Sequence, residues 1–490
     1  MAGLTMTVSG LLALSCCACG FGLPVAAADD FPSEPPVAPL QAGIKLPMPA
    51  AATLDNGMDI VVISNDEIPW VSVSWRLLAG AKFDPGGKPG VASLTAGMLR
   101  QGTENYTSDQ FAEKTDFNAL SIGGGAGHEV TSVTAGSLKD KVDLAVELLA
   151  EAVRRPVFPE KDFARVKAQN VQGMRIAEQD GSYVAGRVFD EWLYGDHFLA
   201  RPAAGTSRTV AGINRADLVA FHKKHYMPNH ATLIFSGDIS TSRAVELAKK
   251  YFGDWAKGSM PPSPKDRVAP DEDTRVVIVD RADTKQVQIR IGHSGFTRDD
   301  PDYVPSRVFN QVFGGSFVSR LNKRVRVKEG FTYGARGGFS AGKEPGLLTI
   351  STFTRPEKAG ETIKALIEEV NGIRDIPPTS EELTDAKSYI IGSFSLSMET
   401  PQDVADKVWD LKFHGLPYTW YDTYLSEVEA LTSDQIQDFA KKHVRLDKLK
   451  IVVVGQSDEV RPLLEDVAPV TVIKPGGQVP PPAKDTVPPA

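Results

Sequence analysis

The chain has 490 residues and a formal net charge of −8; 42% of its residues are hydrophobic and 24% are charged. This length predicts two or three domains, and the composition is typical of a globular protein. The acidic balance excludes a general nucleic-acid binder, which needs a basic surface.

An uncharged segment opens the chain. Residues 1–28 carry no charged side chain, and the apolar run that starts at Val8 ends in three alanines before Asp29. Such a run followed by small residues predicts a signal peptide over 1–28, and hence a periplasmic protein. No other stretch approaches the roughly 18 apolar residues of a membrane span.

All three cysteines lie inside this segment, at Cys16, Cys17 and Cys19. The exported chain is therefore expected to contain neither a disulfide nor a thiolate metal site. The Leu-Ser-Cys sequence that ends at Cys16 leaves a lipid anchor at the N-terminus open as an alternative to a soluble form.

Proline-rich stretches divide the rest of the chain. Residues 29–48 are predicted to be a linker, 258–274 an interdomain linker and 474–490 a disordered tail. These boundaries predict two domains, over 49–257 and 275–473.

The two predicted domains repeat each other. Residues 213–238 align without a gap on 431–456, which places His225 opposite His443, 218 positions later. Self-similarity at a fixed spacing predicts a duplicated module, here of roughly 210 residues.

Each module mixes strands and helices. Two strands are predicted between residues 53 and 80, with Asn56-Gly57 as a turn, and alternation predicts another over 131–138. Residues 139–153 have the spacing of an amphipathic helix, and Ser108 is expected to cap a helix that runs to Leu120. The pattern predicts an α+β fold in which helices cover one face of a sheet.

Four blocks carry a family resemblance. LDNGMDIVV, GVASLTAGMLRQGT, GGGAGHEVTSVTAGSL and PVFPEKDF occur in the order and spacing of the pitrilysin or insulinase family of inverted-motif zinc metallopeptidases. The chain resembles the members that are similar to mitochondrial processing peptidase, over about residues 45 to 470. The resemblance implies two homologous domains, each a mainly antiparallel sheet covered by helices, that form half of a clamshell.

The zinc motif of that family is absent. Active members carry His-x-x-Glu-His on the helix that matches GVASLTAGMLRQGT, with a general-base Glu and two zinc-binding His residues. Here those positions hold Ser93, Ala96 and Gly97, and no carboxylate lies between Phe163 and Ala177, where the family has its third ligand. The resemblance therefore implies an inactive chain with no catalytic residue, no metal and no cofactor of its own.

A second motif is retained. GGSFVSRLNKRVRVKEGFTYGARGGFS resembles the family signature in which an Arg and a Tyr seven positions later form a substrate-binding pair, here Arg326 and Tyr333. A guanidinium and a phenol are both hydrogen-bond donors, which suits a peptide carbonyl whose oxygen gains charge during attack.

The resemblance implies a function for this combination. In two-subunit members one chain keeps the zinc motif and the other the Arg/Tyr pair, so this chain is expected to be the substrate-binding subunit of a heterodimer that acts on peptides, with zinc in its partner. It is expected to be inert alone. The alternative is a structural, assembly or peptide-binding protein of the envelope without a role in proteolysis. An active enzyme with other ligands is disfavoured, because no forward or inverted zinc motif is present.

The histidine spacings and a glycine run do not predict a further functional site. His222, His225 and His230 have a spacing that a metal could use, but only His225 recurs in the repeat, and His128 has no partner spaced for catalysis. The glycine run 123–127 lacks the Lys-Ser/Thr of a phosphate loop, so no nucleotide is expected.

Residues 320–328 hold five basic side chains. Such a run is more often a solvated helix face than a docking site for a partner or an acidic substrate.

Overall fold

The computed structural model describes residues 46–264, 268 and 272–480. The predicted signal peptide with its cysteines, most of the first linker, part of the interdomain linker and the last ten residues lie outside the described residues.

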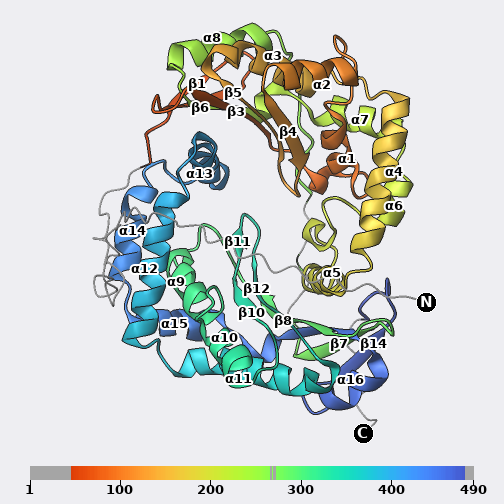
Figure 1. Cartoon of the computed structure of the whole chain (residues 1–490), viewed down its shortest axis with the longest axis vertical. Helices are drawn as coiled ribbons and strands as arrows, with labels where there is room; N and C mark the ends of the chain where they lie inside the picture. Colours follow the sequence, from red (N-terminus) through yellow and green to blue (C-terminus); the bar gives the residue numbers. More distant parts are fainter. Residues whose placement is uncertain (1–45, 265–267, 269–271, 481–490) are drawn as a thin grey trace, which may run out of the picture. The chain divides into compact units, whose positions relative to one another are not determined.

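The first half builds a six-stranded sheet with the strand order β1-β2-β6-β3-β5-β4 (Figure 1). All neighbouring strands are antiparallel except β2 and β6. The first two strands form a hairpin around Asn56-Gly57, and Gly57 adopts a positive φ of 81°, which confirms the turn. The strands are β1 (Ala50–Thr53), β2 (Asp59–Ser64), β3 (Trp70–Leu77), β4 (Ser121–Ala126), β5 (Thr131–Leu138) and β6 (Ala231–Gly237).

The described part of the first half contains eight α-helices. They are α1 (Val91–Met98), α2 (Ser108–Phe117), α3 (Val142–Arg154), α4 (Glu160–Ala177), α5 (Gly181–Tyr194), α6 (Ser207–Ala211), α7 (Arg215–His225) and α8 (Thr241–Phe252). Alternation along β3 places Val71, Val73 and Trp75 in one core with the apolar face of α3. Burying each such side chain stabilises the fold by about 1.5–3 kcal/mol.

The second half repeats the arrangement. Its sheet has the order β14-β7-β13-β8-β12-β10. Five of these strands take the places of their counterparts in the repeat, and β14, from the end of the chain, takes the place of β1. The outermost strand at one end differs in direction, because β14 runs parallel to β7 whereas β1 runs antiparallel to β2. The strands are β7 (Arg275–Asp280), β8 (Val287–Ser294), β10 (Ala335–Phe339), β12 (Leu347–Thr354), β13 (Lys450–Gly455) and β14 (Val470–Ile473), with a short separate pair β9 (Phe296–Thr297) and β11 (Ala341–Gly342).

The helices of the second half follow the same plan. They are α9 (Tyr303–Phe313), α10 (Arg320–Asn322), α11 (Ala359–Asp375), α12 (Ser380–Leu396), α13 (Pro401–His414), α14 (Tyr421–Ala430), α15 (Ser433–His443) and α16 (Ser457–Leu464). A π-helix, η6 (Lys323–Lys328), continues α10.

Two equivalent helices are exchanged between the halves. Helix α5 packs on β8 and β13 of the second sheet, and α13 packs on β3 and β6 of the first (Figure 1). The contact of α13 is partly polar, since Gln402 accepts a hydrogen bond from Ser74 at 3.2 Å and Asp406 pairs with Arg76. Each sheet is thus covered on one face by helices of its own half and on the other by a helix of the opposite half. The predicted cover of each sheet by helices of its own half is confirmed, and the helix from the opposite half on the other face is an addition to it.

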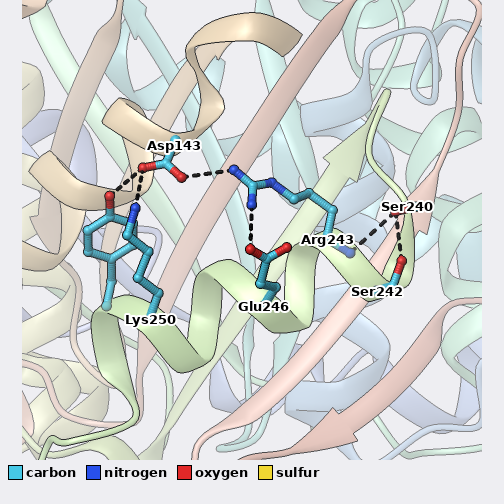
Figure 2. A network of polar contacts seen from close by, with 7 residues as sticks. Asp143, Ser240, Ser242, Arg243, Glu246 and Lys250 are labelled. Carbon is cyan, nitrogen blue, oxygen red and sulfur yellow. Dashed lines mark hydrogen bonds and ion pairs between the residues drawn. The ribbon is translucent and has the colours of Figure 1, made fainter.

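Helices α3 and α8 are also joined at their solvent side by a polar network (Figure 2). Asp143 accepts hydrogen bonds from Arg243 at 2.8 Å, from Lys250 at 2.9 Å and from Tyr251. Ser240 caps α8 by accepting from the Arg243 backbone N–H at 3.3 Å. These charges are largely exposed, so each pair contributes at most about 1 kcal/mol.

The mainly antiparallel α+β architecture with two similar sheets is confirmed. The strand over 131–138 has the predicted limits, and the amphipathic helix begins at Val142 after a 3-10 turn. The cap of α2 is Thr107, not Ser108, because Thr107 forms a capping box with Gln110, and this helix ends at Phe117. Within the described residues, no helix has the length and apolarity needed to cross a membrane.

Candidate functional site

Helix α1 is the element that carries the zinc motif in the resembling family. Its N-terminus is held by the carboxylate of Asp84, which accepts the N–H groups of Gly90 and Ala92, both at 2.7 Å. Burial raises the pKa of Asp84 to about 6, although these two hydrogen bonds favour its charged form. The helix contacts α4, β4 and α7.

The three motif positions lie on one edge of α1. Gly97 is exposed, Ser93 is half-buried and Ala96 is buried. A Cβ placed on Gly97 would meet no atom within 4 Å, so this side of the helix faces open space. Residues four apart share a helix face, and the backbone therefore presents positions 93 and 97 together.

The residues present do not fit a zinc ion. Ser, Ala and Gly at these positions supply neither an imidazole nor a carboxylate. On the neighbouring helix α4, Arg165 donates to Gln101 at 2.6 Å and to Asp162 at 2.9 Å, so a cation stands beside the end of α1.

The histidines of the first half do not form a metal site. His222 contacts the Val153 carbonyl at 2.9 Å, and His225 is buried against Phe83 and Phe221. Burial lowers the pKa of both imidazoles to about 4.

One group of potential metal ligands exists among the described residues, and it lies in the second half. Asp300, Asp302 and His443 have ligand atoms within 4.8 Å of one another. Asp302 already contacts His443 at 2.7 Å and Lys442, while Asp300 accepts the Asp302 N–H at 2.8 Å. Burial acts to raise the pKa of Asp302, but the hydrogen bonds from Lys442 and His443 outweigh it and lower that pKa. This cluster is a set of ion pairs at the start of α9.

Arg326 and Tyr333 lie on the same cavity. Both line a space of about 430 Å³ beside Phe353 and Thr354. The Arg326 guanidinium stands 3.6 Å from the centre of the Phe317 ring, a cation–π contact. Tyr333 is 82% exposed, so its side chain is largely open to solvent. Within the described part of the chain, neither its hydroxyl nor the Arg326 guanidinium has a recorded hydrogen-bond partner.

The backbone around Tyr333 is well held. The Thr352 hydroxyl donates to the Gly334 carbonyl at 2.9 Å and lies 3.2 Å from the Thr332 hydroxyl, and Asn322 accepts the Ala335 N–H at 2.9 Å. These hydrogen bonds fix the backbone from which the exposed Tyr333 side chain projects.

Of the basic run 320–328, part is used inside the chain. Arg320 pairs with Glu382 at 2.8 Å, and Arg324 pairs with Glu329 and Glu368, both at 2.7 Å. Arg326 has no carboxylate within 4.0 Å among the described residues, which sets it apart from these neighbours.

Two features of the site were missed from the sequence. A second cavity of about 1300 Å³ adjoins the first and shares Tyr333 and Phe353 with it. The outer strands β4 and β10 also differ in how their free edges are covered. Both features depend on side chains brought together from distant segments, and no local sequence motif predicts them.

Family comparisons agree with this geometry. Residues 60–204 match the family model described as insulinase (peptidase family M16), and residues 212–390 match the one described as peptidase M16 inactive domain. The chain belongs to the peptidase M16 family. Together the two matches span residues 60–390 apart from a short gap.

Relatives within this family are distant but cover most of the chain. A Helicobacter pylori protein named non-peptidase homolog YmxG is 25% identical over 81% of this chain and 91% of its own length. A Bacillus subtilis protein named uncharacterized zinc protease YmxG is 23% identical over 80% of this chain and 94% of its own.

A solved structure is similar as well. The peptidase M16 inactive domain from Pseudomonas fluorescens matches with a TM-score of 0.78 and 28% identity, over 83% of this chain and 98% of that one. Together with Ser93, Ala96 and Gly97, these likenesses identify the chain as an inactive M16 homologue.

Proposed function

We propose that this chain is the non-catalytic, substrate-binding subunit of a periplasmic zinc endopeptidase whose partner subunit supplies the zinc and the general base. The observation that carries the proposal is the contrast between its two motifs. The zinc positions hold no ligand, whereas Arg326 and Tyr333 remain as two free donors on one cavity.

The edge of the first sheet supports peptide binding. Strand β4 is the outermost strand, and Gly123, Gly124 and Gly125 are exposed. An open edge accepts an extended peptide as an additional strand, and glycines let its backbone approach closely. A peptide on this edge would be held mainly through its backbone.

Arg326 and Tyr333 would act on the peptide carbonyl. The two donors are suited to an oxygen that becomes negative while water attacks, and donors of this kind contribute about 100-fold or more in rate. In the proposed heterodimer they reach the scissile bond from this chain, and the zinc-bearing partner completes the clamshell.

Mixing experiments test this proposal. The purified chain is combined with a homologue that has an intact His-x-x-Glu-His motif, and cleavage of a peptide library is measured for each chain and for the mixture. Activity should appear only in the mixture. Arg326→Ala should lower kcat/KM by about 100-fold and Tyr333→Phe by about tenfold, with the zinc content unchanged.

Arg461→Ala is the matched control, because Arg461 forms an exposed ion pair with Glu465 on α16 and should be silent. Full activity of the Arg326→Ala mixture would refute the substrate role. A stable complex without any peptidase activity would instead favour the second candidate, a structural or assembly protein of the envelope.

Location is part of the proposal. Export through the segment 1–28 is testable by fractionation, and labelling with radioactive palmitate separates a lipid-anchored form at Cys16 from a soluble one.

A further inference from the structure

The large cavity of the second half is positively charged on an acidic protein. It measures about 1300 Å³, and the described residues that line it include four cations and neither Asp nor Glu: Arg290, Arg307, Arg336 and Lys407. Asp and Glu make up 62 of the 490 residues, so about four carboxylates would stand among these 34 lining residues if they were distributed evenly. Carboxylates are thus depleted from this surface.

Two of the cations form the centre of the charge. Arg307 on α9 and Lys407 on α13 both line the cavity; burial lowers the pKa of Lys407, and the charge of Arg307 acts in the same direction. Arg307 lies beside Tyr424, and the Lys407 ammonium lies 5.3 Å from the centre of the Tyr421 ring. Neither cation has a carboxylate within 4.0 Å among the described residues.

The acidic groups nearest to Lys407 are otherwise engaged. Asp403 accepts the Thr400 N–H at 3.1 Å as part of the cap of α13. Asp410 pairs with His414 at 3.2 Å and approaches Arg298 at 3.8 Å. Both carboxylates act to raise the pKa of Lys407, yet neither reaches it. Within the described residues, the ammonium of Lys407 is therefore not neutralised by a direct ion pair.

The remaining cations extend the same field along the cavity. Arg336 is exposed on β10. Arg290 donates to the Ser182 hydroxyl at 2.6 Å, and the charges of Asp190 and Asp180 offset part of its own. The adjoining smaller cavity adds Arg326 and Arg355 and again no carboxylate. A low-dielectric wall that carries one sign of charge concentrates anions within the space it encloses.

Size and chemistry together restrict the ligand. The volume exceeds the roughly 300–1,000 Å³ of cavities that hold one small molecule. Tyr303, Tyr421 and Trp420 supply aromatic surface with polar edges, which suits a peptide better than a bare ion.

We propose that this cavity selects peptides that carry Asp or Glu side chains, with Arg307 and Lys407 as the groups that bind the carboxylates. This inference rests on the proposed peptide-binding function and names the substrate class.

Fluorescence anisotropy with three labelled ten-residue peptides tests it on the full mature chain. The peptides differ at three positions, which hold Glu, Gln or Lys. The Glu peptide should bind at least tenfold tighter than the Gln peptide, and the Lys peptide should bind more weakly than both. Raising the salt from 0.05 to 0.5 M should reduce this preference, because salt screens charges that are open to solvent more than it screens buried ones.

Variants assign the effect to residues. The Arg307→Gln/Lys407→Gln double variant should bind the Glu peptide about tenfold more weakly and the Gln peptide equally well. The control Lys223→Gln/Lys249→Gln changes the net charge by the same amount at two exposed positions of the first half and should have no effect. Arg336→Gln probes the same field from an exposed position and should weaken Glu-peptide binding about threefold even if the double variant does not fold.

The outcomes separate the two proposals. Equal binding of all three peptides, or a preference for the Lys peptide, would overturn the charge inference and leave peptide binding intact. Binding of no peptide would overturn both. A Glu preference that survives in the folded double variant would show that Arg307 and Lys407 are not the groups involved.

Discussion

Strands β4 and β10 occupy equivalent places at the ends of their sheets. They differ in whether other groups hydrogen-bond to the backbone along their free edges. In β10, Asn322 binds the N–H and C=O of Ala335 at 2.9 and 3.0 Å, and Asn310 binds those of Phe339 at 2.7 and 2.8 Å. Between them the Gly337 N–H reaches the Gly314 carbonyl at 3.3 Å.

The edge of β4 has no such cover. Within the described residues, Gly123, Gly124 and Gly125 pair with β5, and no further hydrogen bond of theirs is recorded. Two copies of one module therefore share a topology, while a few side chains decide which edge is closed to a further strand. Native proteins commonly protect an exposed edge, so an edge left open in one copy indicates a use.

Removing the side chain of Asn322, which covers the edge of β10, should have the largest effect on stability. Asn322→Ala leaves the buried N–H and C=O of Ala335 without partners, and we expect a loss of about 3 kcal/mol in the free energy of unfolding, measured by urea denaturation. The control Asn170→Ala removes an exposed side chain that only returns to its own helix, and should change stability by less than about 0.5 kcal/mol. Equal stability of both variants would mean that the cover of β10 is incidental.

The glycines of β4 should separate into a structural and a functional class. A Cβ on Gly124 would lie 2.4 Å from the Ser132 carbonyl oxygen, so Gly124→Val should destabilise the fold by about 2–3 kcal/mol. A Cβ on Gly123 meets nothing within 4 Å, so Gly123→Val should fold normally but weaken peptide binding. Thermal unfolding and anisotropy of the two variants check both statements. Unchanged peptide binding by Gly123→Val would remove β4 from the proposed site.

His225 and His443, which are equivalent in the repeat, also differ in their surroundings. His443 contacts Asp302, whereas buried His225 lies among aromatic rings with a pKa lowered from 6.5 to about 4. Below pH 6.5 the unfolded chain takes up a proton that the folded chain refuses at this position. The contribution of His225 to the free energy of unfolding should therefore fall by about 2 kcal/mol as the pH is lowered from 7 to 5.

The difference in unfolding free energy between the native chain and His225→Gln isolates this contribution. Burial raises the pKa values of Asp84 and Asp190 to about 6, so their contributions to stability rise as the pH falls. Both proteins share these contributions, and the difference between them cancels the effect. A difference that is constant from pH 7 to pH 5 would contradict the assignment.

The smallest effect is expected in helix α1, which carries the zinc motif in active family members. Gly97 is an exposed helical residue with open space at its Cβ, so Gly97→Ala should stabilise the protein by about 0.5–1 kcal/mol. Gly90→Ala is the contrasting variant, because Gly90 has a φ of 105° and its Cβ would lie 2.6 Å from the Ala204 carbonyl oxygen. It should destabilise. A loss of stability in Gly97→Ala would show that this position is constrained after all.

Local patterns predicted much of the fold. The strand over 131–138 follows from alternation, the hairpin from Asn56-Gly57, and the second half from its spacing to the first. The cap of α2 was misplaced by one residue because Thr107 and Ser108 are both good caps, and only Thr107 has a Gln three positions later to complete the box.

Other features are not local. The exchange of α5 and α13 leaves no trace in periodicity, because a helix shows the same apolar stripe whichever sheet it covers. The cavity lining is assembled from segments between Ser182 and Tyr424, so its missing carboxylates become visible only in three dimensions.

By itself the sequence determined the family, the duplication and the loss of the zinc ligands, since each depends on which residues stand at fixed spacings. The tertiary structure alone decided that Arg326 and Tyr333 share a cavity, that β10 is covered while β4 is open, and that four cations face one space. Contacts between residues far apart in the chain depend on packing, and packing is a property of the whole fold.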